Sequence, residues 1–259
     1  MKSKTSGGVI ELAKTLLYAV IIAVGIRTIL YEPFNIPSGS MESTLRVGDY
    51  LFVSKFSYGY SRYSLPLGDH FPSFGRFLFR EPERGDVIVF MFPRDPSEHY
   101  IKRLIGLPGD KIQVIEGTLY INSVATKRVR DGVDLDSERG PRERWLETLP
   151  NGVQHPILLK EREYPTPPTR CERENGDTGD AENTCPFKVP PDHYFMMGDN
   201  RDNSSDSRVA DSGVGMVPAE NLVGRAEIIF FSTNGNARWW EVWNWPFTVR
   251  WERLLKVIR

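Results

Sequence analysis

The sequence predicts a mainly β protein, built from antiparallel sheets or a partly open barrel, that carries one transmembrane helix near its N-terminus. Two observations lead to this fold class. An apolar segment begins within the first ten residues, and after residue 31 short extended runs alternate with turn signals, with no long helical periodicity between them. The chain has 259 residues, 40% of them hydrophobic and 26% charged, so it is neither disordered nor collagen-like.

The charge balance and the cysteine and histidine content exclude several classes of protein. The 33 basic and 34 acidic side chains leave a formal charge of −1 without any block of Lys and Arg, so nucleic acid is not expected as a partner. Two cysteines are too few for a Cys-based zinc cage, and the four histidines are too scattered for a short-spaced pair of metal ligands. We therefore expect no metal and no cofactor.

The first element is the apolar segment at residues 9–30. Its 22 residues would form a helix of roughly 33 Å, just long enough to span the hydrocarbon core of a bilayer. The strictly uncharged part is shorter, at residues 15–26, so Lys14 and Arg27 must extend toward the two interfaces. The segment is predicted to be a transmembrane helix.

Basic residues predict the orientation of this helix. Lys2, Lys4 and Lys14 precede the uncharged part, so the positive-inside rule places residues 1–8 in the cytoplasm and residues 31–259 outside, as an extracytoplasmic domain. A cleaved secretory signal and a helix lying in the membrane interface are the alternatives. Because no small-x-small cleavage site follows the segment, we expect an uncleaved signal anchor.

The extended runs that follow predict the β domain. A Glu116-Gly117 pair between two of them is typical of a hairpin turn. The predicted strands lie at residues 50–53, 86–92, 100–105, 111–115, 118–121 and 226–231.

Residues 126–190 have a different composition, charged and Pro-rich, and we interpret them as a large insertion in the β domain. This insertion contains both cysteines, Cys171 and Cys185, separated by a polar stretch that contains glycine. An extracytoplasmic compartment permits a loop-closing disulfide between them. Two free thiols are the alternative, since the sequence does not show whether the Cα atoms come within bridging distance.

The C-terminal segment is rich in tryptophan. Five of the six tryptophans fall between Trp239 and Trp251, ahead of the basic residues Arg253, Lys256 and Arg259. Amphipathic rings beside cations are typical of a membrane interface, whereas the same rings could also close the core. Both interpretations stay open at this point.

Residues 34–48, FNIPSGSMESTLRVG, place two hydroxyls around a glycine directly after the membrane segment. Gly39 permits a tight turn that would present the Ser40 hydroxyl and leave backbone N–H groups free as oxyanion donors. Pro, Ser and Gly also make ordinary turns, so this motif alone does not indicate catalysis.

The run HYIKRLIGLPGDK contains a lysine in an apolar row. Strand alternation places Lys102 on the same face as Tyr100 and Leu104. Burial there would lower its pKa from about 10.4 toward about 7 to 8, the range that suits a general base. The alternative is a lysine that extends to solvent, as we expect of Arg103 on the opposite face. His99 also falls on the opposite face, so a Ser/His pairing through it is not expected.

The segment GDNRDNSSDSR spans residues 198–208. If it is extended, Ser204, Asp206 and Arg208 share one side, where a carboxylate beside a guanidinium would rigidify the loop and a hydroxyl would orient a neighbouring amine. A calcium loop does not fit, because counting from Asp202 the sixth position is Ser207 and not glycine, and the twelfth is not Glu.

Four stretches, PSGSMESTL, RGDVIVF, YIKRLIGLPGDK and GDNRDNSSDSR, follow one apolar anchor in this order. Together they resemble the boxes of bacterial type I signal peptidase, also called leader peptidase. The resemblance implies a β-rich, membrane-bound serine endopeptidase that removes signal peptides after small residues at the −1 and −3 positions. It also implies an inner (plasma) membrane location with a periplasmic catalytic domain.

The resemblance implies roles for individual residues. Ser40 would be the nucleophile and Lys102 the general base, while the Ser38 hydroxyl and the backbone N–H of Ser40 would form the oxyanion hole. Ser204 would hold the Lys102 amine, and an ion pair would support that loop. The residues implied for the ion pair are Asp206 and Arg208, and those for the substrate pockets are Phe34, Ile36, Leu45, Tyr100 and Ile101. The implied partners are preprotein signal peptides and the lipid bilayer, with the protein a monomer near the secretion translocon.

Two rival functions remain. Asp177-Thr178-Gly179 and Asp211-Ser212-Gly213 match the short signature of aspartic peptidases, although neither follows a hydrophobic strand as that chemistry needs. A membrane-anchored β module that binds exported chains without cutting them would explain the anchor and the tryptophans but not Lys102. The S-x-x-K signature of penicillin-binding proteins is absent from the sequence.

Overall fold

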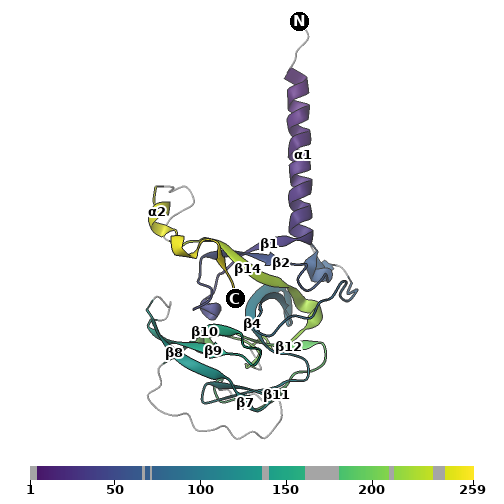
Figure 1. The fold of residues 1–259 in the computed structure, drawn as a ribbon. Helices are drawn as coiled ribbons and strands as arrows, with labels where there is room; N and C mark the ends of the chain where they lie inside the picture. Colours follow the sequence, from purple (N-terminus) through teal and green to yellow (C-terminus); the bar gives the residue numbers. More distant parts are fainter. Residues whose placement is uncertain are drawn as a thin grey trace.

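A computed structural model describes residues 5–65, 68–70, 72–135, 140–160, 181–209, 213–235 and 243–259. Helix α1, Thr5–Ile29, projects from one end of a β body (Figure 1). Within it, Ile10–Ile29 is long and apolar enough to cross a membrane and is not covered by the rest of the protein. The helix predicted at residues 9–30 is therefore present.

The largest sheet has the strand order β1-β2-β14-β3-β4-β12-β13, and β15 pairs with β14. All of its pairings are antiparallel, as the sequence predicted. Its strands are β1 Tyr31–Asn35, β2 Asp49–Ser54, β3 Val87–Phe92, β4 Asp95–Gly106, β12 His193–Met197, β13 Met216–Pro218, β14 Leu222–Ser232 and β15 Lys256–Val257. Alternate residues of β2 and β5 are buried, which is what a sheet with one covered face requires.

A four-stranded sheet with the order β11-β5-β6-β7 continues from the C-terminal end of β4. Glu116 and Gly117 connect β5 to β6 with positive φ values of 49° and 69°, the conformation of a two-residue hairpin turn. The predicted hairpin is therefore confirmed. The strands are β5 Lys111–Ile115, β6 Thr118–Ile121, β7 Val124–Ala125 and β11 Phe187–Lys188.

A third sheet, with the order β10-β9-β8, lies within the segment interpreted as an insertion. The Leu158 N–H donates to the Asp199 carbonyl at 2.9 Å, so the edge of this sheet contacts the loop after β12. Its strands are β8 Lys127–Asp134, β9 Arg142–Thr148 and β10 Gln154–Leu159. Figure 1 shows β8–β10 on the part of the β body farther from α1.

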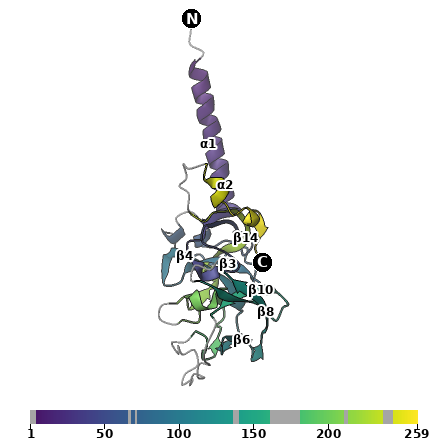
Figure 2. The same ribbon diagram turned by 90° about the vertical axis from the view of Figure 1, so that its left-hand side faces the viewer.

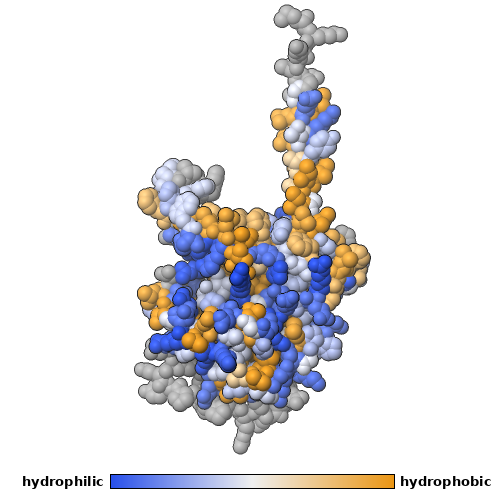
Figure 3. All heavy atoms as spheres, in the orientation of Figure 1, coloured by the Kyte–Doolittle hydropathy of each residue, from blue (hydrophilic) through white to orange (hydrophobic). Residues whose placement is uncertain are grey.

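The tryptophan-rich C-terminal segment does not close the core in its described part. Trp243, Trp245 and Trp251 are 67%, 42% and 61% exposed. The short helix α2, Trp245–Thr248, lies at the end of the β body from which α1 projects (Figures 1 and 2). Figure 3 shows apolar side chains along α1 and on the adjoining end of the body, the arrangement expected beside a membrane.

Candidate active site

Ser40 and Lys102 meet although 62 positions of chain separate them. Ser40 is buried in a short 3₁₀ turn, Gly39–Met41, a few residues beyond the end of β1, and Lys102 lies in the second half of β4. The Lys102 Nζ atom is 2.6 Å from Ser40 Oγ and 3.0 Å from the carbonyl oxygen of Ile101. The amine is therefore within proton-transfer distance of one hydroxyl.

Burial determines the protonation of Lys102, a residue that is only 3% exposed. Loss of solvation lowers the pKa of Lys102 from 10.5 to about 8, while the carboxylates of Asp206 and Asp199 oppose this shift and Arg208 adds to it. The Tyr100 ring lies 5.5 Å from the ammonium. At pH 7 roughly one such amine in ten is neutral, enough for a general base.

Ser38 and Asn200 flank the Ser40 turn. Ser38 is exposed, and its Oγ lies 3.5 Å from Ser40 Oγ, on the side of the cleft. Asn200 holds the turn from behind, because its N–H donates to the Ser40 carbonyl at 3.2 Å and its side-chain amide donates to the Gly39 carbonyl at 3.0 Å. Asn200 carries no distinctive signal in the sequence, since amides in loops are common.

The loop that follows β12 supplies the predicted ion pair. Arg208 donates to both carboxylate oxygens of Asp206, at 2.9 and 2.8 Å, and both side chains are buried. Burial alone would raise the pKa of Asp206, but Arg208 and the Gly198 N–H lower it. The Ser204 hydroxyl oxygen is also buried, yet within the described residues it makes no hydrogen bond to Lys102.

Gly198 allows this loop to approach the Ser40 turn. A Cβ atom added at Gly198 would lie 2.5 Å from the Ser40 carbonyl oxygen, closer than real Cβ contacts occur. The glycine is therefore required by close packing between the two loops that position the dyad.

A cleft of about 710 Å³ opens in front of Ser40 and Lys102. Of the residues predicted to line substrate pockets, Tyr100 and Ile101 face this cleft. Leu45 is completely buried in the core together with Ile36, and Phe34 packs against this core and against the ring of His99 at 5.1 Å. The complete lining is Pro37, Ser38, Gly39, Ser40, Glu98, His99, Tyr100, Ile101, Lys102, Asn203 and Ser205.

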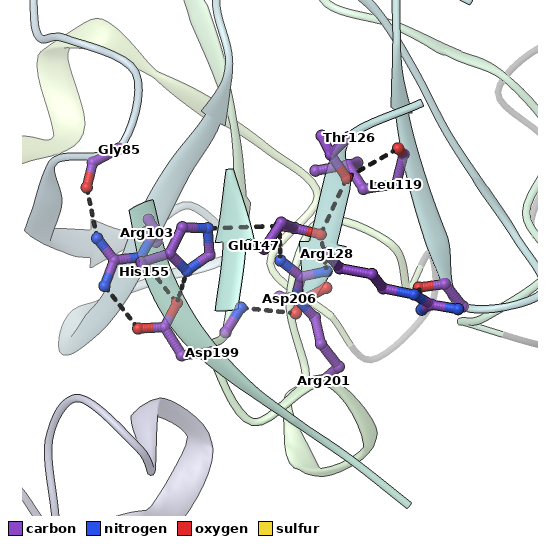
Figure 4. Close-up of polar contacts among 12 residues, drawn as sticks. Gly85, Arg103, Leu119, Thr126, Arg128, Glu147, His155, Asp199, Arg201 and Asp206 are labelled. Atoms are coloured by element: carbon purple, nitrogen blue, oxygen red, sulfur yellow. Dashed lines mark hydrogen bonds and ion pairs between the residues drawn. The ribbon is translucent and has the colours of Figure 1, made fainter. Parts of the chain in front are cut away.

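The prediction that Arg103 extends to solvent is wrong. Its side chain is completely buried and pairs with Asp199 through two contacts of 2.8 and 2.7 Å (Figure 4). Arg103 also donates to the Gly85 carbonyl at 2.6 Å. Strand alternation correctly directs it away from Lys102, but it cannot show that the opposite face is covered by a loop 96 positions later.

This buried pair continues into a longer chain of buried polar side chains. The His155 ring has its Nδ1 3.2 Å from Asp199 Oδ1 and its Nε2 3.3 Å from Glu147 Oε2, and Arg201 pairs with Glu147 on the far side (Figure 4). Burial would raise the pKa of Glu147, but Arg201 and His155 lower it well below its usual range. Burial would also raise the pKa of Asp199, but Arg103 and His155 lower it well below its usual range.

Several predictions concern residues outside the described part. Cys185 is buried and disulfide-bonded, but Cys171 lies outside the described residues, so the expected pairing stays a prediction. Asp177 and Asp211 of the aspartic-peptidase signatures also lie outside them. Across the described ranges, no group of three His, Cys, Asp or Glu side chains could hold a metal ion.

Comparisons with known proteins agree on one family. The sequence model described as "Signal peptidase, peptidase S26" matches residues 9–231. Signal peptidase I of Rickettsia massiliae (strain Mtu5) is 45% identical over 226 residues, which are 87% of this chain and 80% of the relative. Signal peptidase I of Rickettsia typhi (strain ATCC VR-144 / Wilmington) is 43% identical over 248 residues, 92% of this chain and 86% of the relative.

A solved structure is also similar in sequence. The crystal structure of a signal peptidase I from Enterococcus faecalis V583 is 30% identical and covers 56% of this chain and 97% of its own, with a TM-score of 0.32.

Proposed function

The chain belongs to the signal peptidase family, peptidase S26, and from this premise we propose that it is a membrane-anchored serine endopeptidase that cleaves signal peptides through a Ser40/Lys102 dyad. The observation that carries the proposal is the 2.6 Å contact between Ser40 Oγ and a lysine whose pKa is lowered to about 8. A charged ammonium donates across this contact, whereas the neutral amine accepts the hydroxyl proton. Only the second arrangement activates a nucleophile.

In the proposed reaction, neutral Lys102 takes the hydroxyl proton as Ser40 Oγ bonds to the scissile carbonyl carbon, and the carbonyl electron pair moves onto oxygen. The intermediate collapses with cleavage of the C–N bond, and Lys102 returns its proton to the leaving amine. Water then attacks the acyl-enzyme ester and loses a proton to Lys102, and the C–Oγ bond breaks as Lys102 returns that proton to Ser40 Oγ, which releases the new carboxyl end. Ser38 and the Ser40 N–H would donate to the oxyanion, each worth up to about 3 to 4 kcal/mol.

The sheet edges beside the cleft support an extended substrate. β1 is the end strand of its sheet. The part of β4 before Arg103 pairs with β3 on one side only. On its other side, the pairing of β4 with β12 begins at Arg103. A peptide in strand conformation can add to such an edge through backbone hydrogen bonds. Tyr100 and Ile101 would then contact its side chains, and the small residues at −1 and −3 would face the cleft wall.

The short connection between α1 and the β body supports a cleft near a membrane. α1 ends at Ile29 and β1 begins at Tyr31, so the β body starts within two residues of the apolar span. By the positive-inside rule, residues 1–8 would be cytoplasmic and the β body extracytoplasmic. A signal peptide that leaves the bilayer beside α1 would therefore reach Ser40 without a long path.

The test is cleavage of a signal-bearing preprotein by the full chain reconstituted in lipid or detergent. We expect the wild-type protein to release the mature chain and Ser40→Ala to release none, while Ser205→Ala, at a second serine of the same cleft, keeps near-normal activity. Cleavage by Ser40→Ala at the wild-type rate would contradict the dyad and favour another peptidase mechanism. A wild-type protein that binds the preprotein without cutting it would favour the non-catalytic β module.

A further inference from the structure

His155 occupies an unusual position for a residue outside the cleft. It lies on β10, in the three-stranded sheet, and its side chain has no exposed surface. Both ring nitrogens face carboxylates, Nδ1 at 3.2 Å from Asp199 and Nε2 at 3.3 Å from Glu147 (Figure 4). The ring therefore stands between two carboxylates, one beside each of its nitrogens.

Along the resulting chain, side chains that carry nitrogen alternate with carboxylates. It runs from Arg103 through Asp199, His155 and Glu147 to Arg201, and each carboxylate lies between two nitrogen groups (Figure 4). All five side chains are buried, so water does not compensate for a missing partner. Removal of the central ring would leave each carboxylate without one of its two nitrogen partners.

The Asp199 end of this chain contacts the parts that carry the dyad. Asp199 accepts a hydrogen bond from Thr44 Oγ1 at 2.5 Å, four residues after Ser40. It pairs with Arg103, the residue next to Lys102, and is followed by Asn200, which holds the Ser40 turn. Asp199 therefore joins the Ser40 segment, the Lys102 strand and, through His155, the three-stranded sheet.

The Glu147 end is structurally different. Glu147 lies on β9, and its other partners are Arg201 and Thr126, with Thr126 Oγ1 donating at 3.2 Å. Neither Thr126 nor Glu147 lines the cleft. The two nitrogens of His155 thus contact different parts of the protein. Nδ1 contacts Asp199, beside the dyad, and Nε2 contacts Glu147, within the three-stranded sheet.

We propose that His155 is a positioning residue for the dyad: through its Nδ1 contact it holds Asp199 against Arg103 and Thr44, and so maintains the Ser40 Oγ to Lys102 Nζ geometry. The proposal rests on the proposed peptidase function. It assigns a purpose to the three-stranded sheet, whose edge at Leu158 also bonds to the Asp199 carbonyl. A displacement of about 1 Å between reacting groups can lower a rate by roughly 100-fold.

Two amide substitutions separate the two ends. In His155→Asn the side-chain nitrogen occupies the place of Nδ1 beside Asp199, whereas in His155→Gln it occupies the place of Nε2 beside Glu147. Both variants lose the ring and one of its two nitrogen contacts, so a purely structural role predicts equal effects. We expect kcat of His155→Gln to fall roughly 10- to 100-fold with little change in KM, and kcat of His155→Asn to stay within about 3-fold of wild type.

The same two substitutions at His193, a partly exposed histidine on β12 whose Nδ1 contacts the Pro191 carbonyl, provide the matched control. We expect both to leave kcat unchanged. All rate constants are referred to the folded fraction measured by circular dichroism. Equal kcat values for His155→Asn and His155→Gln would overturn the proposal.

Hydrogen exchange gives a readout that does not depend on turnover. In His155→Gln, the peptides covering residues 38–44 and 198–204 should exchange faster than in His155→Asn, because Asp199 has lost its contact with the nitrogen at position 155. This holds even if the wild-type protein cleaves no preprotein, which would contradict the proposed function alone. Equal exchange in the two variants would overturn the positioning role.

Glu147→Gln tests the proposal from the far side, in case the His155 variants fold poorly. It leaves the His155 contact to Asp199 in place while it weakens the pair with Arg201. We expect a lower melting temperature with kcat within about 3-fold of wild type. A loss of kcat as large as that of His155→Gln would show that the cluster acts only as general support, and would overturn the proposal.

Discussion

Lys102 and Arg103 are neighbours on β4 and both are buried, yet their surroundings are opposite. Arg103 donates to both oxygens of Asp199 and to three further oxygens, of Gly85, Thr44 and Arg259. Lys102 contacts a hydroxyl and a backbone carbonyl, and no carboxylate lies within ion-pair distance of it among the described residues. The face of β4 that carries Arg103 supplies a carboxylate partner for the cation, whereas the face that carries Lys102 does not.

The difference shows how a fold can keep a lysine poised near neutrality. Asp206 and Asp199 both raise the pKa of Lys102, but each is paired with a guanidinium of its own, so neither compensates fully for the loss of solvation. An unpaired buried cation lowers the free energy of unfolding, whereas a paired one lowers it strongly only when its partner is removed. The substitutions below test this contrast.

The largest expected effect is on catalysis, at the unpaired cation. Lys102→Met should lower kcat by at least about 10² to 10⁴-fold, because the general base is gone while the shape of the side chain is kept. The measurement is single-turnover cleavage of a preprotein. Cleavage within 10-fold of wild type would remove Lys102 from the mechanism.

The matched substitution at the paired cation should act on stability. Arg103→Met leaves Asp199 buried beside His155 without its guanidinium, so we expect the free energy of unfolding to fall by about 3 to 5 kcal/mol. Denaturant unfolding measures this. A loss below about 1 kcal/mol would contradict the distinction between the two faces of β4.

Lys102→Met should have the opposite effect on stability. Below pH 8 Lys102 is protonated in both the folded and the unfolded protein, and its lowered pKa corresponds to a cost of roughly 3 kcal/mol. Between about pH 8 and 10.5 only the unfolded chain keeps the proton, so this cost shrinks as the pH rises. The variant should therefore be more stable than wild type at pH 7, with the gap closing toward pH 10.5.

Unfolding curves of both proteins across this pH range test the sign. A variant that is less stable at pH 7 would contradict the account of Lys102 as an uncompensated buried cation.

The smallest effect concerns the pH dependence of cleavage. Because Lys102 must be neutral, kcat/KM should rise with pH to a plateau, with a midpoint at about pH 8. Asp206 raises the pKa of Lys102, so Asp206→Asn should move this midpoint to lower pH. A profile that stays in place or moves to higher pH would exclude Asp206 as an electrostatic neighbour of the base. Only the folded fraction of the variant is compared.

Local pattern was sufficient for most of the main fold. The apolar length of α1, the alternation in β5 and the Glu116-Gly117 turn are local properties, and each predicted the element that forms. The sheet of β8, β9 and β10 was not predicted because its strands carry charges on partly covered faces. Residues such as Arg144 pair across strands there, and their alternation does not separate apolar from polar positions.

The residues of the site also differ in whether the local sequence predicts them. The Ser40 and Lys102 segments carry their own short motifs, and Asp206 pairs with Arg208 only two residues away. By contrast, Asp199 is 96 positions from Arg103, and the partners of His155 come from other strands and loops, so no local signal identifies them. Leu45 has the apolar character of a pocket residue but is completely buried in the core.

The most direct test of the account is an NMR titration of the Lys102 amine itself. Lysine labelled with ¹³C at Cε is incorporated into the full-length protein, and the Lys102 resonance is identified by its loss in Lys102→Arg. The account predicts a titration midpoint at about pH 8. A midpoint at the ordinary lysine value of 10.5 would mean that the amine is charged throughout the neutral range, and would contradict its role as the base.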